Sequence, residues 1–256
     1  NRLAIVGESG MGALTYKPDI HFESPRQDLD LDEISKRCRE ILETSSCENL
    51  DHLFHLGGSS GGARPKILTK IDGEEWIIKF PSCDDKKDIG KQEYEYSLCA
   101  KECGIEMMQT RLFPSERCAG YFGTRRFDRK RDAGGAVGKI HMLSVSAILE
   151  TSHRIPNLDY HLLMKLTLEI TKDFSEVLKL YRLMCFNVFA HNRDDHSRNF
   201  SYLYDEQEAC YKLTILEAAV QAGIRETQAR KTACDIRECV EDMLEGYLEK
   251  HMVYKI

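Results

Sequence analysis

The sequence contains no basic excess, no long hydrophobic run and no closely paired cysteines, and each absence excludes a class of protein. Lys and Arg number 36 against 42 Asp and Glu, which gives a formal net charge of −6. A general nucleic-acid binder would need a basic surface to displace counterions. No apolar run approaches the roughly 20 residues that span a bilayer, and the opening residues lack the shape of a signal peptide. We therefore expect a cytoplasmic protein with no membrane partner, and, because the first residue is Asn1 rather than Met, further residues before it.

The composition is that of a globular chain with a substantial core. Hydrophobic residues make up 42% and charged residues 30% of the 256 residues, which excludes wholesale disorder. Ten cysteines are present, none of them in a Cys-x-x-Cys pair: Cys38, Cys47, Cys83, Cys99, Cys103, Cys118, Cys185, Cys210, Cys234 and Cys239. A disulfide scaffold would be shorter and richer in loops, so we interpret them as free, buried thiols in a reducing cytosol. Zinc ligation ranks well below this interpretation, because no pair has ligand spacing.

Hydrophobic periodicity and turn residues divide the chain into a strand-rich first half and a helical second half. An Asp-Gly turn at 72–73 between apolar runs predicts a hairpin, and Gly104 predicts the end of a helix. The expected strands are 3–6, 13–16, 66–69, 75–80, 121–127, 200–203 and 210–213, and the expected helices are 30–43, 88–103, 160–171, 173–190 and 214–251. A β-rich part followed by a helical part predicts two lobes with a cleft between them.

The polar segment 192–199, which follows an apolar helix, carries the strongest chemical pattern. Phosphoryl transfer needs a carboxylate that orients or deprotonates the acceptor hydroxyl, and an oxygen ligand for the magnesium that bridges the phosphates. Arg193-Asp194, with Asn199 five residues after the aspartate, matches the kinase catalytic-loop spacing R-D-x-x-x-x-N. By pattern alone, a polar loop that caps the helix fits equally well.

Lys79 stands at the end of an apolar strand, where a charge is unusual unless it reaches a partner. On its own it fits an edge-strand lysine that blocks aggregation. Its position in the chain favours another role, because it follows the glycine-rich segment 57–62 by one hairpin and precedes a helix that contains Glu93. Glycine loop, lysine and helix glutamate occur in this order in protein kinases, where the loop and the lysine hold the phosphates.

A second glycine-rich segment, Gly7-Glu8-Ser9-Gly10-Met11-Gly12, is similar to a dinucleotide-binding loop. That fingerprint requires a helix immediately after the glycines. Here the chain continues Ala-Leu-Thr-Tyr-Lys-Pro, in which no helical pattern starts. We therefore reject a dinucleotide site at this position.

Taken together, these residues resemble the HipA family of serine/threonine kinase toxins, over roughly residues 1–213. The matching segments are 10–14, 61–66, 78–81, 126–129, 141–144 and 192–200. As a set, in this order and spacing, they are specific. The resemblance implies an α+β, bilobal protein-kinase-like fold, with a β-rich N-lobe over 1–128 and an all-helical C-lobe over 129–256. It also implies transfer of the ATP γ-phosphate to a serine or threonine of a protein.

The resemblance also implies roles for individual residues. Asp194 would be the catalytic base, Asn199 a ligand of Mg²⁺, and Lys79 the contact to the phosphates, paired with Glu93. The glycine-rich loop would bring Gly61, Gly62 and Ala63 to the nucleotide, and the backbone from Arg125 to Phe127 would be the hinge that reads adenine. Ser59, with Ser60 as its neighbour, matches the serine that this family autophosphorylates. A phosphate there adds about −1.5 to −2 charge beside the ATP phosphates, which would switch the enzyme off.

The partners implied by the resemblance are proteins. They are a protein substrate of the aminoacyl-tRNA synthetase class, a helix-turn-helix antitoxin that supplies the DNA contacts, and a separate chain carrying the family's small N-terminal subdomain. That subdomain is absent from the sequence, so we expect it to be trimmed or supplied by another protein.

One departure from the family lies after Leu213, where a Pro-x-Tyr-Asp segment normally provides the second magnesium ligand. Here Leu213 runs directly into Thr214, and Asp205 lies on the wrong side of the hairpin to substitute. The segment is either deleted or part of a disordered loop between these two residues, and we favour the loop. A Cα separation near 3.8 Å would indicate an unbroken chain.

Three functions remain open at this point. The leading hypothesis is a protein kinase toxin. A nucleotide-binding pseudokinase without turnover is supported by the missing magnesium ligand, and a small-molecule phosphotransferase of related fold would need an open, acidic acceptor pocket.

Overall fold

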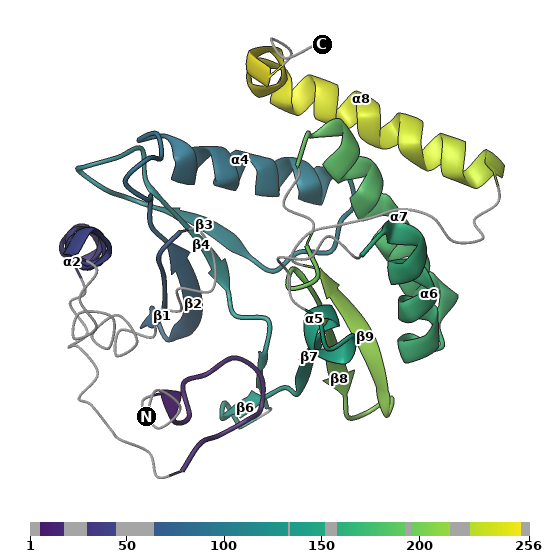
Figure 1. The fold of residues 1–256 in the computed structure, drawn as a ribbon, viewed down its shortest axis with the longest axis horizontal. Helices are drawn as coiled ribbons and strands as arrows, with labels where there is room; N and C mark the ends of the chain where they lie inside the picture. The colour runs from purple at the N-terminus through teal and green to yellow at the C-terminus, as the bar shows by residue number, and fades with distance from the viewer. Residues whose placement is uncertain are drawn as a thin grey trace. The chain divides into compact units, whose positions relative to one another are not determined.

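The structure, a computed structural model, describes residues 6–17, 30–44, 64–132, 134–151, 158–192, 196–215 and 226–251 (Figure 1). The chain divides into two compact units. The first comprises Asn1–Glu95 with Met108–Lys139, and the second comprises Tyr96–Met107 with Ile140–Ile256. The boundary between residues 128 and 129 stays a prediction.

The first unit is built on a four-stranded antiparallel sheet of order β1-β2-β4-β3. Its strands are β1 (Lys66–Ile71), β2 (Glu74–Lys79), β3 (Thr110–Phe113) and β4 (Tyr121–Arg125). The turn between β1 and β2 holds Asp72 at φ 53° and Gly73 at φ 79°. Two consecutive positive φ angles are the geometry of a two-residue hairpin turn that Asp-Gly favours, so the predicted hairpin is confirmed.

Aromatic packing on one face of this sheet forms the core of the first unit. The rings of Trp76 and Phe113 pack edge to face, with their centroids 5.3 Å apart. This arrangement stabilises the fold beyond what burial of the ring area contributes. The predicted amphipathic helix is confirmed as α2 (Leu31–Thr44), which adds Ile34 and Cys38 to the same core.

Helix α4 (Ile89–Glu102) lies against the start of β4 because of one glycine. A Cβ atom on Gly90 would stand 2.2 Å from the carbonyl oxygen of Gly120, so no side chain fits there without displacing backbone. The helix ends before Gly104, which has φ 72° and serves as the expected stop. A short second hairpin in this unit pairs β5 (Arg129–Arg131) with β6 (Val137–Lys139).

Residues 6–17 form turns and bends rather than the strand expected at 13–16. Of the other strand expected near the start, only Val6 is described, and it belongs to a helical turn. The strand prediction at 13–16 is wrong, because the Tyr16 N–H donates to the Gly7 carbonyl within the same segment. Arginine side chains bind the carbonyls of Ser9, Gly10 and Gly12, as described below.

The second unit combines a three-stranded antiparallel sheet with helices. The sheet has the order β7-β8-β9, with β7 (Met142–Ser144), β8 (Phe200–Asp205) and β9 (Cys210–Ile215). Strands β8 and β9 are the expected hairpin. The expectation of an all-helical second lobe is therefore corrected, because the hairpin and β7 bury Phe200 and Tyr202 in the core.

The helices of the second unit are α5 (Val145–Ile148), α6 (Tyr160–Thr171), α7 (Phe174–Phe189) and α8 (Glu226–His251). The helix predicted from Thr214 is partly wrong, since Thr214 and Ile215 pair with Ser201 and Phe200 in the sheet. Side chains of Asp159 and Asp173 cap α6 and α7 as expected for helix starts. Within the described ranges, no helix is both long and apolar enough to cross a membrane.

Candidate active site

Lys79 and Glu93, which the sequence predicts as partners, are brought together in the first unit. The Lys79 ammonium donates to Glu93 Oε2 over 2.9 Å. Lys79 ends β2, and Glu93 lies one turn into α4, three residues after the close contact at Gly90. The Lys79 side chain is 40% exposed and its ammonium also lies 5.5 Å from the centre of the Phe122 ring. It is therefore held in one direction while solvent and solutes can reach it.

Arg64, the first described residue after the glycine-rich loop, shares the Glu93 carboxylate with Lys79. Its Nη1 donates to Glu93 Oε1, and its Nε and Nη2 donate to the two oxygens of Asp85 over 2.8 and 3.0 Å. Asp85 also accepts from the N–H and the hydroxyl of Ser82. A guanidinium bound in this bidentate way is fixed in plane and position, so the end of the glycine-rich loop is tied to α4.

These contacts favour the charged forms of Asp85 and Arg64. Burial alone would raise the pKa of Asp85, but hydrogen bonds from Arg64 and Ser82 outweigh it and hold that pKa below its ordinary value. Burial likewise opposes the charge on Arg64, and hydrogen bonding to Asp85 together with the charge of Glu93 raises its pKa overall. The charges of Lys79 and Arg64 are thus balanced by Glu93 and Asp85, and the partly exposed Lys79 ammonium is the group that an anionic ligand can contact.

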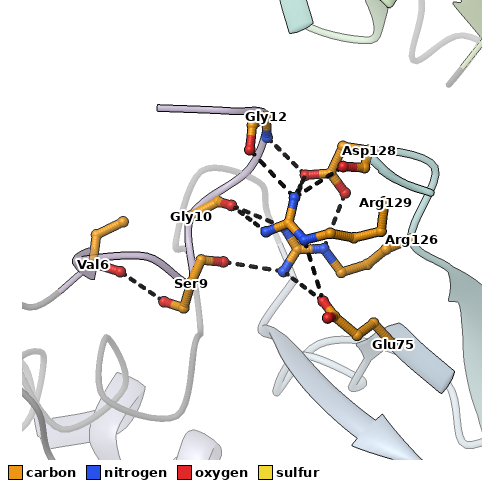
Figure 2. A network of polar contacts seen from close by, with 8 residues as sticks. All are labelled: Val6, Ser9, Gly10, Gly12, Glu75, Arg126, Asp128 and Arg129. Atoms are coloured by element: carbon orange, nitrogen blue, oxygen red, sulfur yellow. Dashed lines mark hydrogen bonds and ion pairs between the residues drawn. The ribbon is translucent and has the colours of Figure 1, made fainter. Parts of the chain in front are cut away.

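Behind the predicted hinge lies a buried ionic network centred on Asp128 (Figure 2). Asp128 is fully buried, and it accepts from Arg126 Nε and Nη2 over 3.0 and 2.8 Å, and from Arg129 Nη1 over 2.8 Å. A fourth bond comes from the Gly12 N–H over 2.7 Å. Burial raises the pKa of Asp128, but the hydrogen bond and charge of Arg126 and the charge of Arg129 outweigh burial, so its pKa lies below the ordinary value.

The same two arginines hold the N-terminal glycine-rich segment. Arg126 donates to the carbonyl oxygens of Ser9 and Gly10 over 3.0 and 2.9 Å, and Arg129 also donates to the Gly10 carbonyl over 2.9 Å (Figure 2). Carbonyls of this segment accept from arginines and the Gly12 N–H donates to Asp128, so the segment is bound to protein side chains on both counts, and no helix follows it within 6–17. A dinucleotide loop would instead present N–H groups at a helix start.

The predicted hinge residues lie at the end of β4 and just beyond it. The N–H of Arg125 donates to the Gln109 carbonyl over 2.9 Å, and the N–H of Arg126 donates to the Glu75 carbonyl over 2.8 Å. Phe127 is buried. Adenine recognition through either of these two N–H groups would require breaking a sheet hydrogen bond.

Both ends of the predicted catalytic loop make backbone hydrogen bonds within the second unit. The N–H of Asn192 donates to the Asn187 carbonyl over 2.9 Å at the end of α7, and Asn199 closes a turn by donating to the His196 carbonyl over 2.9 Å. The Ser197 carbonyl accepts from Ser146 of α5. Asp194 itself lies outside the described residues, as do Ser59, Ser60, Gly61, Gly62 and Ala63.

Strand β9 runs without interruption across Leu213 and Thr214, which pair with Tyr202 and Ser201. The Leu213 N–H also donates to the buried Glu176 carboxylate over 2.9 Å. The two residues are therefore neighbours in one strand, and the favoured idea of a loop between them is corrected. This chain carries no Pro-x-Tyr-Asp segment at that point.

Sequence reasoning missed several residues that the structure brings into the site. Arg64 lies in a segment that carries the family resemblance, yet its pairing with Glu93 was not foreseen. No sequence motif marks Asp85 as a site residue, because it lies in a loop with several other charged residues. Asp128 lies in the matching segment 126–129, but its burial depends on Arg126 and Arg129 and on Gly12, which lies 116 positions earlier in the chain.

Comparison with known proteins defines the class and then the family. The fold is similar to that of HipA from Shewanella oneidensis MR-1, in a complex with HipB and operator DNA, with a TM-score of 0.60 over 99% of this chain and 80% of that one. At 14% identity this likeness establishes a kinase-like α+β fold. Residues 58–240 match the HipA-like C-terminal domain model, and the chain belongs to this family.

A relative by sequence is "Putative kinase Y4mE" of Sinorhizobium fredii (strain NBRC 101917 / NGR234). It is 35% identical over an alignment of 170 residues, and the match covers 58% of this chain and 39% of that protein. The chain thus spans well under half the length of this relative.

Proposed function

We propose that this protein is a serine/threonine protein kinase that transfers the ATP γ-phosphate to a protein hydroxyl. The observation that carries the proposal is the Lys79–Glu93 ion pair between a sheet strand and a helix, next to the end of a glycine-rich loop. Membership of the HipA-like family and a relative named as a kinase support it. In protein kinases, this lysine and helix glutamate must be paired before the phosphates are held for transfer.

In the proposed reaction, Lys79 binds the phosphates as a point charge, and Glu93 with Arg64 holds it in place. Asp194 accepts the proton of the attacking hydroxyl. Asn199 would provide an amide oxygen to Mg²⁺, the type of ligand this ion prefers. The ion would neutralise charge on the phosphates. The segment from Arg125 to Phe127 would contact adenine, and Gly61, Gly62 and Ala63 would cover the phosphates.

We further propose that the kinase is the toxin of a toxin–antitoxin pair and autophosphorylates at Ser59 or Ser60. The solved complex of the Shewanella HipA contains HipB and operator DNA, which supports a helix-turn-helix antitoxin as partner and an indirect link to DNA. The protein substrate would be of the aminoacyl-tRNA synthetase class, and a separate chain would supply the N-terminal subdomain.

One observation favours a second candidate, a nucleotide-binding pseudokinase. Strand β9 continues where the family places its second magnesium ligand, so Asn199 would have to serve without that carboxylate. Mg²⁺ is usually held by one or two carboxylates together with substrate phosphates. Such a protein would bind ATP without turning it over.

Incubation with γ-labelled ATP and Mg²⁺ tests the proposal. The wild type should acquire label at Ser59 or Ser60, while Asp194→Asn, which keeps the side-chain shape but removes the base, should acquire none. Label in neither protein, with undiminished ATP affinity, would select the pseudokinase. Label appearing only on an added aminoglycoside or small alcohol would instead indicate a small-molecule phosphotransferase.

A further inference from the structure

Three cysteines from two helical segments gather in the core of the second unit. Cys99 lies on α4, Cys103 follows the last residue of that helix and its N–H donates to the Cys99 carbonyl over 2.9 Å, and Cys239 lies on α8. All three Sγ atoms lie within 4.8 Å of one another. Cys99 and Cys103 are buried, and Cys239 is half-buried.

A fourth sulfur lies at the open side of this cluster. The Sδ atom of Met243, one turn after Cys239 on α8, is 3.9 Å from the Cys239 Sγ. Met243 is 42% exposed, so the cluster has a path to solvent on this side. Two sulfur atoms thus come from i and i+4 on α8, and two from i and i+4 at the end of α4 and the turn after it, positions that share one face of a helical segment.

The spacing of the thiols is close to that of a thiolate metal site. Zinc–sulfur bonds of about 2.3 Å in tetrahedral geometry place neighbouring sulfurs about 3.8 Å apart. Sulfur atoms that already lie within 4.8 Å of one another would need to move by about 1 Å at most, which side-chain rotation can supply. No two of these cysteines stand in Cys-x-x-Cys spacing, but the helical i, i+4 spacing of Cys99 and Cys103 and a third thiol from a distant helix bring them together, so the low rank of zinc in the sequence prediction is revised.

The surroundings select a soft ion over a hard one. The cluster is embedded in apolar side chains such as Val240 and Leu244, and its donors are thiols and a thioether. Soft sulfur ligands favour Cu(I) and Zn(II), whereas Mg²⁺ and Ca²⁺ require oxygen.

We propose that Cys99, Cys103 and Cys239 form a binding site for a soft d¹⁰ metal ion, Cu(I) or Zn(II), with the Met243 thioether as a fourth ligand. On binding, three S–H bonds break, four sulfur–metal bonds form, three to thiolates and one to the thioether, and three protons pass to solvent, with no change of oxidation state. Because bound metal joins α4 to α8, and free energy of binding is free energy of folding, the ion would stabilise the second unit.

The experiment uses the reduced protein, titrated separately with Zn(II) and with Cu(I) held by a competing chelator. We expect one ion per chain, release of protons, a thiolate-to-metal charge-transfer band and a higher Tm. Cys239→Ala should weaken binding by at least about 100-fold, because loss of outer-shell partners alone costs roughly 10–100-fold. The matched control is Cys234→Ala, an exposed thiol on the same helix, which should bind as the wild type does.

Two further measurements keep the outcome decisive if a variant misfolds. In the wild type, the bound ion should protect the half-buried Cys239 from alkylation, while the exposed Cys83 and Cys234 still react. Met243→Leu should weaken Cu(I) more than Zn(II), because the thioether is a soft ligand. The proposal is overturned if the reduced wild type binds neither ion stoichiometrically, if Cys239→Ala binds as tightly, or if these thiols only form a disulfide in air.

Discussion

Replacing Asp128 by Asn should destabilise the first unit severely, although the two side chains have the same shape. The carboxylate is fully buried and accepts four hydrogen bonds, three of them from Arg126 and Arg129. An amide keeps one acceptor oxygen and turns an NH₂ group toward guanidinium donors. In the better amide orientation, with the oxygen in place of Oδ2, the charge-assisted bond from Arg126 to Oδ1 is lost, which contributes roughly 1.5–3 kcal/mol. The two buried arginines also lose one counter-charge and, among the described residues, keep only Glu75. Removing one partner of a buried ion pair costs about 3–5 kcal/mol, and we expect a loss in this range.

Urea unfolding followed by the fluorescence of Trp76 measures this loss in the right part of the molecule. Trp76 is the only tryptophan in the sequence, and it is buried in the same unit, opposite Arg125 in the sheet. The control is Asp72→Asn, which removes a carboxylate from an exposed pair with Arg111 and should cost less than about 1 kcal/mol. A similar small cost for Asp128→Asn would refute the reasoning.

The pH dependence provides a second check on the same carboxylate. Arg126 and Arg129 hold the pKa of Asp128 below its ordinary value of 3.8. The pKa is depressed in the folded state, so its stabilising contribution is present above the unfolded value and is lost as pH falls through the folded value. The wild type should therefore lose stability below about pH 4, and Asp128→Asn should show a shallower acid slope.

Two other substitutions probe how the fold positions its parts. Gly90→Ala should displace α4 from β4, because its Cβ would stand 2.2 Å from a backbone oxygen; ATP affinity and Tm should both fall. Gly246→Ala on α8, where nothing lies within 4 Å, should instead be neutral or stabilise by up to about 1 kcal/mol. Glu176→Gln should cost about 1–3 kcal/mol in chemical denaturation, because the buried carboxylate accepts from Leu213 and pairs with Lys179. Glu169→Gln, at an exposed pair, should be silent, and equal costs for the two glutamates would contradict the assignment.

Local signals in the sequence predicted the elements that depend on local physics. The Asp72-Gly73 hairpin and the helix ending before Gly104 both follow from backbone preferences of the residues themselves. Elements that depend on distant partners were missed or misplaced. Thr214 and Ile215 continue a helical pattern in the sequence, yet they form a strand because β8 offers them a partner. Residues 13–16 have apolar character but no strand to pair with.

In the candidate site, too, some residues could be predicted from their order along the chain, and others depend on contacts between distant residues. The pairing of Lys79 with Glu93 could be predicted, because the order of loop, strand lysine and helix glutamate is visible along the chain. The role of Arg64 could not be read in this way, since it depends on the close approach of α4 to the sheet at Gly90. The thiol cluster joins residues about 140 positions apart, which spacing rules for short motifs cannot detect.

The most direct measurement of the central claim is ATP affinity, by calorimetry, of three proteins in the presence of Mg²⁺. The wild type should bind ATP, and so should Lys70→Met, which removes an exposed lysine from the neighbouring strand β1. Lys79→Met should lose at least about tenfold in affinity, since hydrogen bonds to charged groups contribute roughly 1.5–3 kcal/mol and 1.4 kcal/mol is tenfold. Binding of ATP by Lys79→Met as tightly as by the wild type, or by none of the three proteins, would contradict a nucleotide site at Lys79.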